Sequence, residues 1–350
     1  MAKLSARKYT TAYYLLILGF LMKSVGAAWD VSYHFKYFRE LYQLPHILNT
    51  LGNILVLIMW WYLWRNESKA KRGPLKFVLA GILVFLFGVG FDQWWHQKFG
   101  LDLSIWSPAH ITLYVGSLIS VAGGLLYIKQ GQRQKKISVK SQVYYVIFLV
   151  FIFEAFWFVL VQQEQGVITD YYLHQGIHTM SEDLYVAFFQ TQRDIYSGIP
   201  HWIYGAWAAL SMAFIFTIAH RLVRLRFPAT AVAGMYVFFR FVMNTIFIIV
   251  SYPTSTVPYY VLGIAVVFDL SRFILKNSWT SKFISTSMIP LGIGAIGVIE
   301  TAYPIHPPMP QETFVYAICA SVIGYFLAEF FYQVLFFRYW DTSLKAHNSS

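Results

Sequence analysis

The sequence has 350 residues, of which 57% are hydrophobic and 19% aromatic, while only 12% are charged. Soluble domains carry about twice this share of charged residues. The composition therefore excludes an ordinary soluble globular protein and predicts a membrane protein with several spanning helices. The net charge of +11 indicates no nucleic-acid partner, because basic connections between spans and their attraction to anionic lipid account for it.

The apolar residues gather into segments of about 20, the length that crosses a lipid bilayer. We predict an all-α bundle of ten transmembrane helices, near residues 9–28, 46–64, 75–91, 108–128, 143–161, 200–219, 229–252, 257–275, 283–301 and 313–337. The first segment resembles a signal peptide, but its length suits a spanning helix, so we expect it to be retained. One transmembrane domain, 1–350, would contain five hairpins, at 9–64, 75–128, 143–226, 229–275 and 283–338.

Basic residues indicate the orientation of these spans. Most of the 27 Lys and Arg residues lie at the two chain ends or in the connections that follow even-numbered spans. Positively charged connections stay on the cytoplasmic side of a membrane. We therefore expect a multi-pass protein of the cell membrane with both termini in the cytoplasm, and with the connections after odd-numbered spans outside.

A carboxylate and two imidazoles are predicted to meet at the outer end of the second hairpin. Asp92 and His96 end the third span, and Pro108 and His110 begin the fourth. Residues four apart share one face of a helix, and proline fits the first turn of the next helix. The three side chains are a plausible ligand set for copper, with zinc or iron as alternatives, and the single cysteine, Cys319, leaves no role for several thiolates.

The same arrangement occurs in two other hairpins, which favours a fold built from a repeated unit. In each, Asp-x-x-x-His is followed by a histidine directly after a proline. The candidate metal ligands of the three hairpins are Asp30, His34 and His46, then Asp92, His96 and His110, and then Asp170, His174 and His201.

Charged residues also occur inside the predicted spans. Arg240 lies in the middle of one and requires an acidic partner, for which Glu154 and Glu329 lie at a similar depth. Lys23 is interpreted as part of a structural ion pair or as a side chain that reaches the membrane surface. These four residues could also line the polar path of a transporter.

The run DQWWHQKFGLDLSIWSPAH, residues 92–110, resembles the copper-ligand segment of one membrane enzyme family. This is the C subunit of the copper membrane monooxygenases, which oxidise ammonia or methane, and the archaeal ammonia-oxidising members are the most similar. The resemblance implies that Asp92, His96 and His110 bind copper, and that this subunit works beside partner membrane subunits. Asp30, His34 and His46 match the same ligand types in a shorter loop.

Two functions are consistent with this sequence. In the first, the protein is a copper-dependent, monooxygenase-like oxidoreductase or a subunit of one, which activates O₂ for a small apolar substrate that enters from the lipid. In the second, it is a non-catalytic protein that binds or transports metal, or an accessory scaffold in a larger membrane complex. The sequence names neither the substrate nor the partner subunits.

Overall fold

The structure is a computed structural model that describes residues 6–34, 44–69, 72–99, 105–132, 139–174, 202–276, 278–298, 307, 309 and 311–338. The regular structure in these ranges is helical, which confirms the all-α prediction. The helices are α1 (Ala6–His34), α2 (Leu44–Asn66), α3 (Gly73–Phe99), α4 (Pro108–Gln132), α5 (Val139–His174), α8 (Trp202–Leu222), α9 (Pro228–Ile249), α10 (Tyr259–Ile274), α11 (Trp279–Val298), α12 (Thr313–Phe331) and the π-helix η3 (Tyr332–Arg338).

Eight of the described helices are long and apolar enough to cross a bilayer: α1 to α5, α8, α9 and α12. This confirms a multi-pass membrane protein in contact with lipid. The other two predicted spans, 257–275 and 283–301, fall on α10 and α11, which are not among the eight. Because α10 has 16 residues and a spanning helix needs about 20, the count of ten spans stays a prediction.

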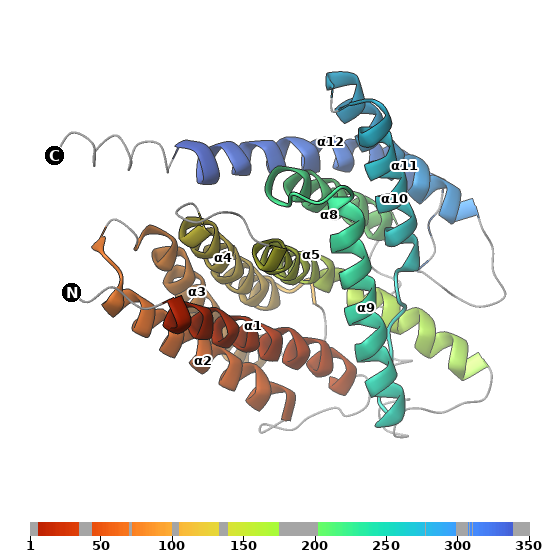
Figure 1. Cartoon of the computed structure of the whole chain (residues 1–350). Helices are drawn as coiled ribbons and strands as arrows, with labels where there is room; N and C mark the ends of the chain where they lie inside the picture. The colour runs from red at the N-terminus through yellow and green to blue at the C-terminus, as the bar shows by residue number, and fades with distance from the viewer. Residues whose placement is uncertain are drawn as a thin grey trace.

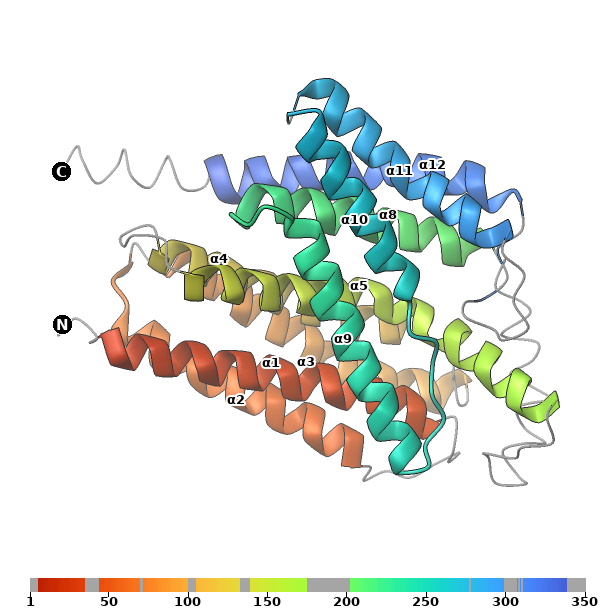
Figure 2. The same cartoon turned by 45° about the vertical axis from the view of Figure 1, so that its right-hand side comes forward.

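Most of the helices run roughly along one axis, whereas α9 and the α10–α11 hairpin cross that direction obliquely (Figures 1 and 2). The beginning of α1 and the end of α12 lie at the same end of the bundle in both views. An even number of passes produces this arrangement. The side of the membrane on which this end lies stays a prediction.

Helix α5 occupies the middle of the bundle, where it packs against α1, α4, α8 and α9. Its apolar residues surround the whole helix, a pattern typical of a buried helix. Phe148, Phe153 and Trp157 are almost completely buried. The Trp157 ring packs against Tyr204 of α8 and Tyr236 of α9, so aromatic contacts join three helices at the centre.

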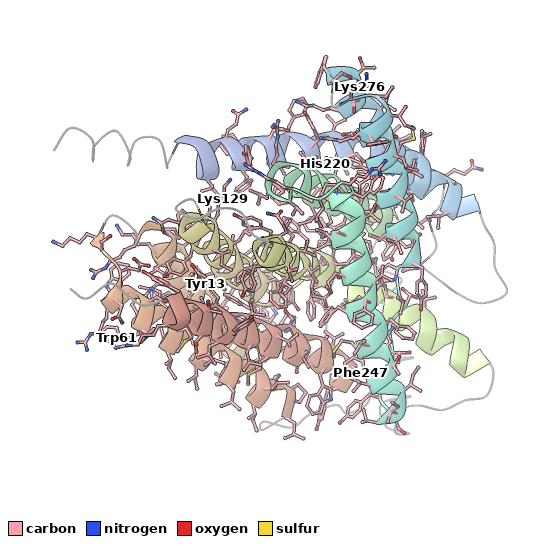
Figure 3. All side chains as sticks on the ribbon, in the orientation of Figure 1. Tyr13, Trp61, Lys129, His220, Phe247 and Lys276 are labelled. Carbon is pink, nitrogen blue, oxygen red and sulfur yellow. The ribbon has the colours of Figure 1, made fainter. Side chains whose placement is uncertain are left out.

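The outer surface of the bundle is also apolar. Trp61 of α2 is 50% exposed and Phe238 of α9 is 61% exposed. Figure 3 shows Trp61 at the periphery, whereas Tyr13 of α1 points inward. Large apolar side chains that face outward would be unfavourable in water and are stable against lipid chains.

Glycines allow the backbones of α3 and α4 to touch. Gly81 and Gly88 lie seven residues apart on α3, as do Gly116 and Gly123 on α4, so each pair lies on one helix face. A Cβ atom added to Gly116 would stand 2.5 Å from the backbone nitrogen of Phe85 and 2.9 Å from the oxygen of Gly81. A larger residue would therefore force the two helices apart.

The antiparallel pair of α1 and α2 uses the same spacing. Gly19 and Gly26 lie seven residues apart on α1 and face Gly52 and Asn49 of α2. A Cβ atom on Gly26 would stand 2.8 Å from the backbone nitrogen of Asn49, and one on Gly52 would stand 2.7 Å from the oxygen of Gly19. In both hairpins the second glycine lies four residues before the Asp of the Asp-x-x-x-His motif.

The third close pair, α8 and α12, joins segments that are distant in the sequence. The Trp202 ring stacks on Tyr316 near the start of both helices, and Arg221 binds Glu329 at 2.7 Å near their ends. The two helices are therefore parallel, and Glu329 is not the partner of Arg240. The predicted third hairpin pairs α5 with α8, but α8 packs more extensively along α12 than along α5. A hairpin repeat throughout the chain therefore stays a prediction.

A buried carboxylate joins α1, α2 and α4 at the end of the bundle opposite His110. Glu67 accepts hydrogen bonds from the hydroxyl groups of Tyr9 and Tyr127, both at 2.8 Å. We expect Glu67→Ala to lower the free energy of unfolding by about 1–3 kcal/mol, because Tyr127 would lose its buried partner. Denaturation in detergent measures this, with the exposed Glu312→Ala as control, and equal stability of both variants would contradict it.

Candidate metal centre

Local structure places all three ligands of the second hairpin at one end of the α3–α4 pair. Helix α3 continues past Asp92 and His96, which therefore lie one turn apart on the same face. Pro108 is the first residue of α4, as its position in the sequence predicts. The Ser107 hydroxyl accepts a hydrogen bond from the backbone N–H of His110 at 3.2 Å, which satisfies a donor of the first helical turn.

The three side chains converge on one point. The Nε2 atom of His96 lies 3.4 Å from Oδ2 of Asp92, and the Nε2 atom of His110 lies 3.2 Å from Oδ1 of Asp92. One donor atom from each of the three residues lies within 4.8 Å of the other two. Donors that bind a common ion at about 2.0–2.1 Å lie about 3.0–3.4 Å from one another. Each histidine lies within this range of one carboxylate oxygen, His96 of Oδ2 and His110 of Oδ1, so small side-chain movements would bring all three groups onto a shared ion.

The surroundings of these side chains also suit a cation. The side chains of Asp92, His96 and His110 are 25%, 21% and 20% exposed. The Oδ1 atom of Asp92 is buried and accepts no hydrogen bond of regular geometry from any described residue. The Nε2 atom of His110 lies 3.2 Å from this oxygen without a regular hydrogen bond, so the carboxylate is only partly satisfied, and a metal ion between the three groups would satisfy it fully. Nitrogen and oxygen donors without sulfur are compatible with copper, zinc or iron.

The first hairpin brings together two of its three predicted ligands. The Nε2 atom of His46 lies 2.8 Å from Oδ1 of Asp30, and these side chains are 49% and 30% exposed. His34 is the last residue of α1, and its side chain lies outside the described residues. The charge of Asp92 also acts on His46, so the two hairpins place their polar groups near one another.

The third predicted ligand set is not tested by the structure. Asp170 and His174 belong to the last turns of α5, but their side chains lie outside the described residues. His201 lies wholly outside them. A metal site in the third hairpin therefore stays a prediction.

One metal ion should bind tightly to each chain, because the described residues bring three such donors together only at Asp92, His96 and His110. We expect His46→Ala to leave this tightly bound ion in place, since His46 lies beside Asp30 in the first hairpin and is not one of the three donors that converge. Elemental analysis after dialysis against a chelator measures the metal content per chain. Loss of one equivalent of metal in His46→Ala would instead assign an ion to the first hairpin.

Sequence reasoning identified the interior polar residues only in part. Arg240 does pair with Glu154, with Nη1 3.5 Å from Oε1. Its closer partner is Glu164, with Nη2 2.5 Å from Oε2, and this residue was missed. Glu164 lies in the run Gln-Gln-Glu-Gln at 162–165, directly after the predicted span 143–161 and therefore within the predicted connection. Helix α5 instead continues to His174, so this polar run lies within a spanning helix, where polar residues form buried contacts.

Lys23 has a different environment from the two that its sequence position suggested. Its Nζ atom donates a hydrogen bond to Oδ1 of Asn53 at 2.6 Å and lies 4.1 Å from the centre of the Phe85 ring. The side chain is buried. An amide oxygen and an aromatic face therefore stabilise this amine at the contact between the first two hairpins.

Comparison with known proteins gives no relative, because no family model, no curated protein and no solved structure matches this chain. The features that bear on function are therefore the geometry of the site and the motif in residues 92–110.

Proposed function

We propose that this protein is a membrane-embedded copper protein, and that it acts as a monooxygenase-like oxidoreductase or as a subunit of one. Asp92, His96 and His110 are the proposed copper ligands. The observation that carries the proposal is the approach of one carboxylate and two imidazoles, from two helices, to within 4.8 Å of one another.

The choice of copper has two supports. The donor set contains two imidazole nitrogens and one carboxylate oxygen, which suits copper, and residues 92–110 resemble the copper-ligand segment of the monooxygenase C subunit. When bound, copper would supply the redox chemistry that activates O₂. Trp94 and Phe99, 50% and 63% exposed beside the ligands, form an apolar surface through which a small apolar substrate would arrive from the lipid.

The chain's own residues would set the geometry of this centre. Asp92 faces His96 with one carboxylate oxygen and His110 with the other, so it fixes the orientation of both rings. The glycine contact between α3 and α4 sets the distance between the helices and therefore the place of His110. Such rigid support keeps a metal site at the spacing that its ion requires.

A second function has an observation in its favour. About a fifth to a quarter of each ligand side chain is exposed, so an ion could exchange with the solution at the end of the bundle. This exposure suits a non-catalytic protein that binds or transports metal. An accessory scaffold of a larger membrane complex would need no exchange and no turnover.

Turnover separates these functions. The protein is purified from its native membranes with any bound subunits, loaded with copper, and supplied with O₂, a reductant and either ammonia or a short hydrocarbon. The proposal predicts an oxidised product that is lost in His96→Ala and retained in His220→Ala, whose histidine bonds to Asp269 on α10. Retained copper without product in the wild-type complex would favour the carrier or scaffold.

A further inference from the structure

A second polar cluster lies between α5 and α9, apart from the candidate metal centre. It contains Glu154 and Glu164 from α5 and Arg240 from α9, with side chains that are 4%, 0% and 3% exposed. All three belong to helices that can span the membrane. Ionisable side chains at such positions are costly and commonly serve a function.

The two carboxylates have different surroundings. Oε1 of Glu164 accepts hydrogen bonds from Nε1 of Trp157 at 2.8 Å and from the hydroxyl of Tyr204 at 3.0 Å, and Oε2 binds Arg240 at 2.5 Å. Glu154 contacts Arg240 only at 3.5 Å through Oε1. The Tyr236 hydroxyl of α9 also lies beside this carboxyl as a hydrogen-bond partner, although neither Oε2 nor that hydroxyl makes a hydrogen bond of regular geometry with a described residue. Glu164 therefore has three close donors that stabilise its carboxylate, whereas Glu154 has the more distant Arg240 and the Tyr236 hydroxyl, which can also accept a hydrogen bond from a protonated acid.

The charges of this cluster do not balance when both acids are ionised. The guanidinium of Arg240 provides one positive charge against two negative charges, and its Nη2 atom also donates to the neutral hydroxyl of Ser255 at 2.7 Å. An excess charge buried in a low-dielectric interior is strongly unfavourable. A bound proton on one of the acids would remove it.

No other described group near the cluster supplies the missing positive charge. The other titratable side chains that act on these three residues are Tyr236 of α9, Tyr204 of α8 and Tyr260 of α10. They are phenols, which are neutral at neutral pH. Helices α1 and α4 also pack against α5, but among the described residues the side chains that act most strongly on Glu154 are Arg240 and Tyr236, both from α9.

We propose that Glu154 is a proton-binding site inside the membrane, which holds a proton on Oε2 at neutral pH while Arg240 remains paired with Glu164. Release of this proton would leave two carboxylates to share one guanidinium. The contact between α5 and α9 would then change, because Arg240 is the residue of α9 that both acids bind. The site thus gives the protein a means to couple uptake or release of a proton to the packing of these two helices.

Infrared spectroscopy of the protein in lipid tests this proposal through the carbonyl band of a protonated carboxylic acid. The band should be present in the wild type, absent in Glu154→Gln, and larger in Arg240→Gln, where both acids would have to bind protons. Deuterium exchange would shift the band and so identify it as an acid. No difference between the wild type and Glu154→Gln would overturn the proposal.

Stability provides a second readout. Because glutamine has the shape and charge of a protonated glutamate, Glu154→Gln should unfold at nearly the same denaturant concentration as the wild type. Glu164→Gln should unfold at a clearly lower concentration, since it removes the partner of Arg240. Equal losses of stability in both variants would overturn the assignment of a proton. It would also be overturned if the acid band were missing and the unfolding midpoint rose with sodium concentration, because a sodium ion would then take the place of the proton. Glu154→Gln should also keep its metal content, so this test is independent of the proposed copper centre.

Discussion

Replacing His110 by alanine is expected to weaken copper binding by more than about 100-fold. His110 is the only ligand of the proposed site on α4, and its loss leaves the two donors of α3. Changes to groups that merely orient a metal ligand already cost about 10–100-fold in affinity, so removal of a ligand should cost more. Competition with a chelator of known affinity measures the change in purified protein.

Two further variants sharpen this prediction. Asp92→Asn keeps the shape of the side chain and removes its charge, so it should also weaken copper binding. His220→Ala removes a histidine that bonds to Asp269 on a different pair of helices and should leave the affinity unchanged. Similar affinities in the wild type, His110→Ala and Asp92→Asn would exclude the proposed ligand set.

Placing valine at Gly116 is expected to lower the free energy of unfolding by about 3 kcal/mol or more. Overpacking of a close contact commonly costs about 1–3 kcal/mol, and here the new side chain would meet the backbone of Phe85 and Gly81, which cannot rotate away. Reversible unfolding in detergent measures the loss.

Gly90 provides a matched control on α3, because a Cβ atom added there meets nothing within 4 Å. Gly90→Ala should be neutral or stabilising by up to about 1 kcal/mol, since alanine favours a helix over glycine. Gly116→Val should also reduce copper affinity, because it moves His110 away from Asp92. A folded Gly116→Val protein with unchanged affinity would show that the helix contact does not set the site.

Much of the candidate site could be predicted from the sequence because its determinants are local. Asp92 and His96 are four residues apart on one helix, and Pro108 marks where the next helix begins. A short connection between adjacent spans makes them neighbours. These relations place three ligands at one end of a hairpin without knowledge of the other helices.

Contacts between helices that are distant in the sequence could not be predicted in the same way. Glu154 and Glu329 both lie at a depth suited to Arg240, but depth does not specify which helices are neighbours. Glu329 pairs with Arg221 because α12 lies along α8, and Arg240 reaches Glu164 because α9 crosses α5. The packing of side chains over the whole bundle decides these partners.

The number of spans shows another limit of sequence reasoning. Hydropathy measures whether a segment is apolar, but it does not specify where a helix ends. The segment 257–275 is apolar over the length of a span, yet α10 begins only at Tyr259, after the prolines Pro253 and Pro258, and ends at Ile274. Pro258 precedes the first helical residue and Leu275 follows the last, so α10 has 16 residues and is shorter than the apolar segment at both ends.

The most direct test of the copper centre is pulsed electron paramagnetic resonance of the copper-loaded protein, which counts the histidine nitrogens bound to the ion. The wild type should show two coordinated histidines, and His96→Ala and His110→Ala should each show one. A wild-type spectrum without histidine nitrogens, or one that neither variant changes, would contradict the assignment of Asp92, His96 and His110 as the metal centre.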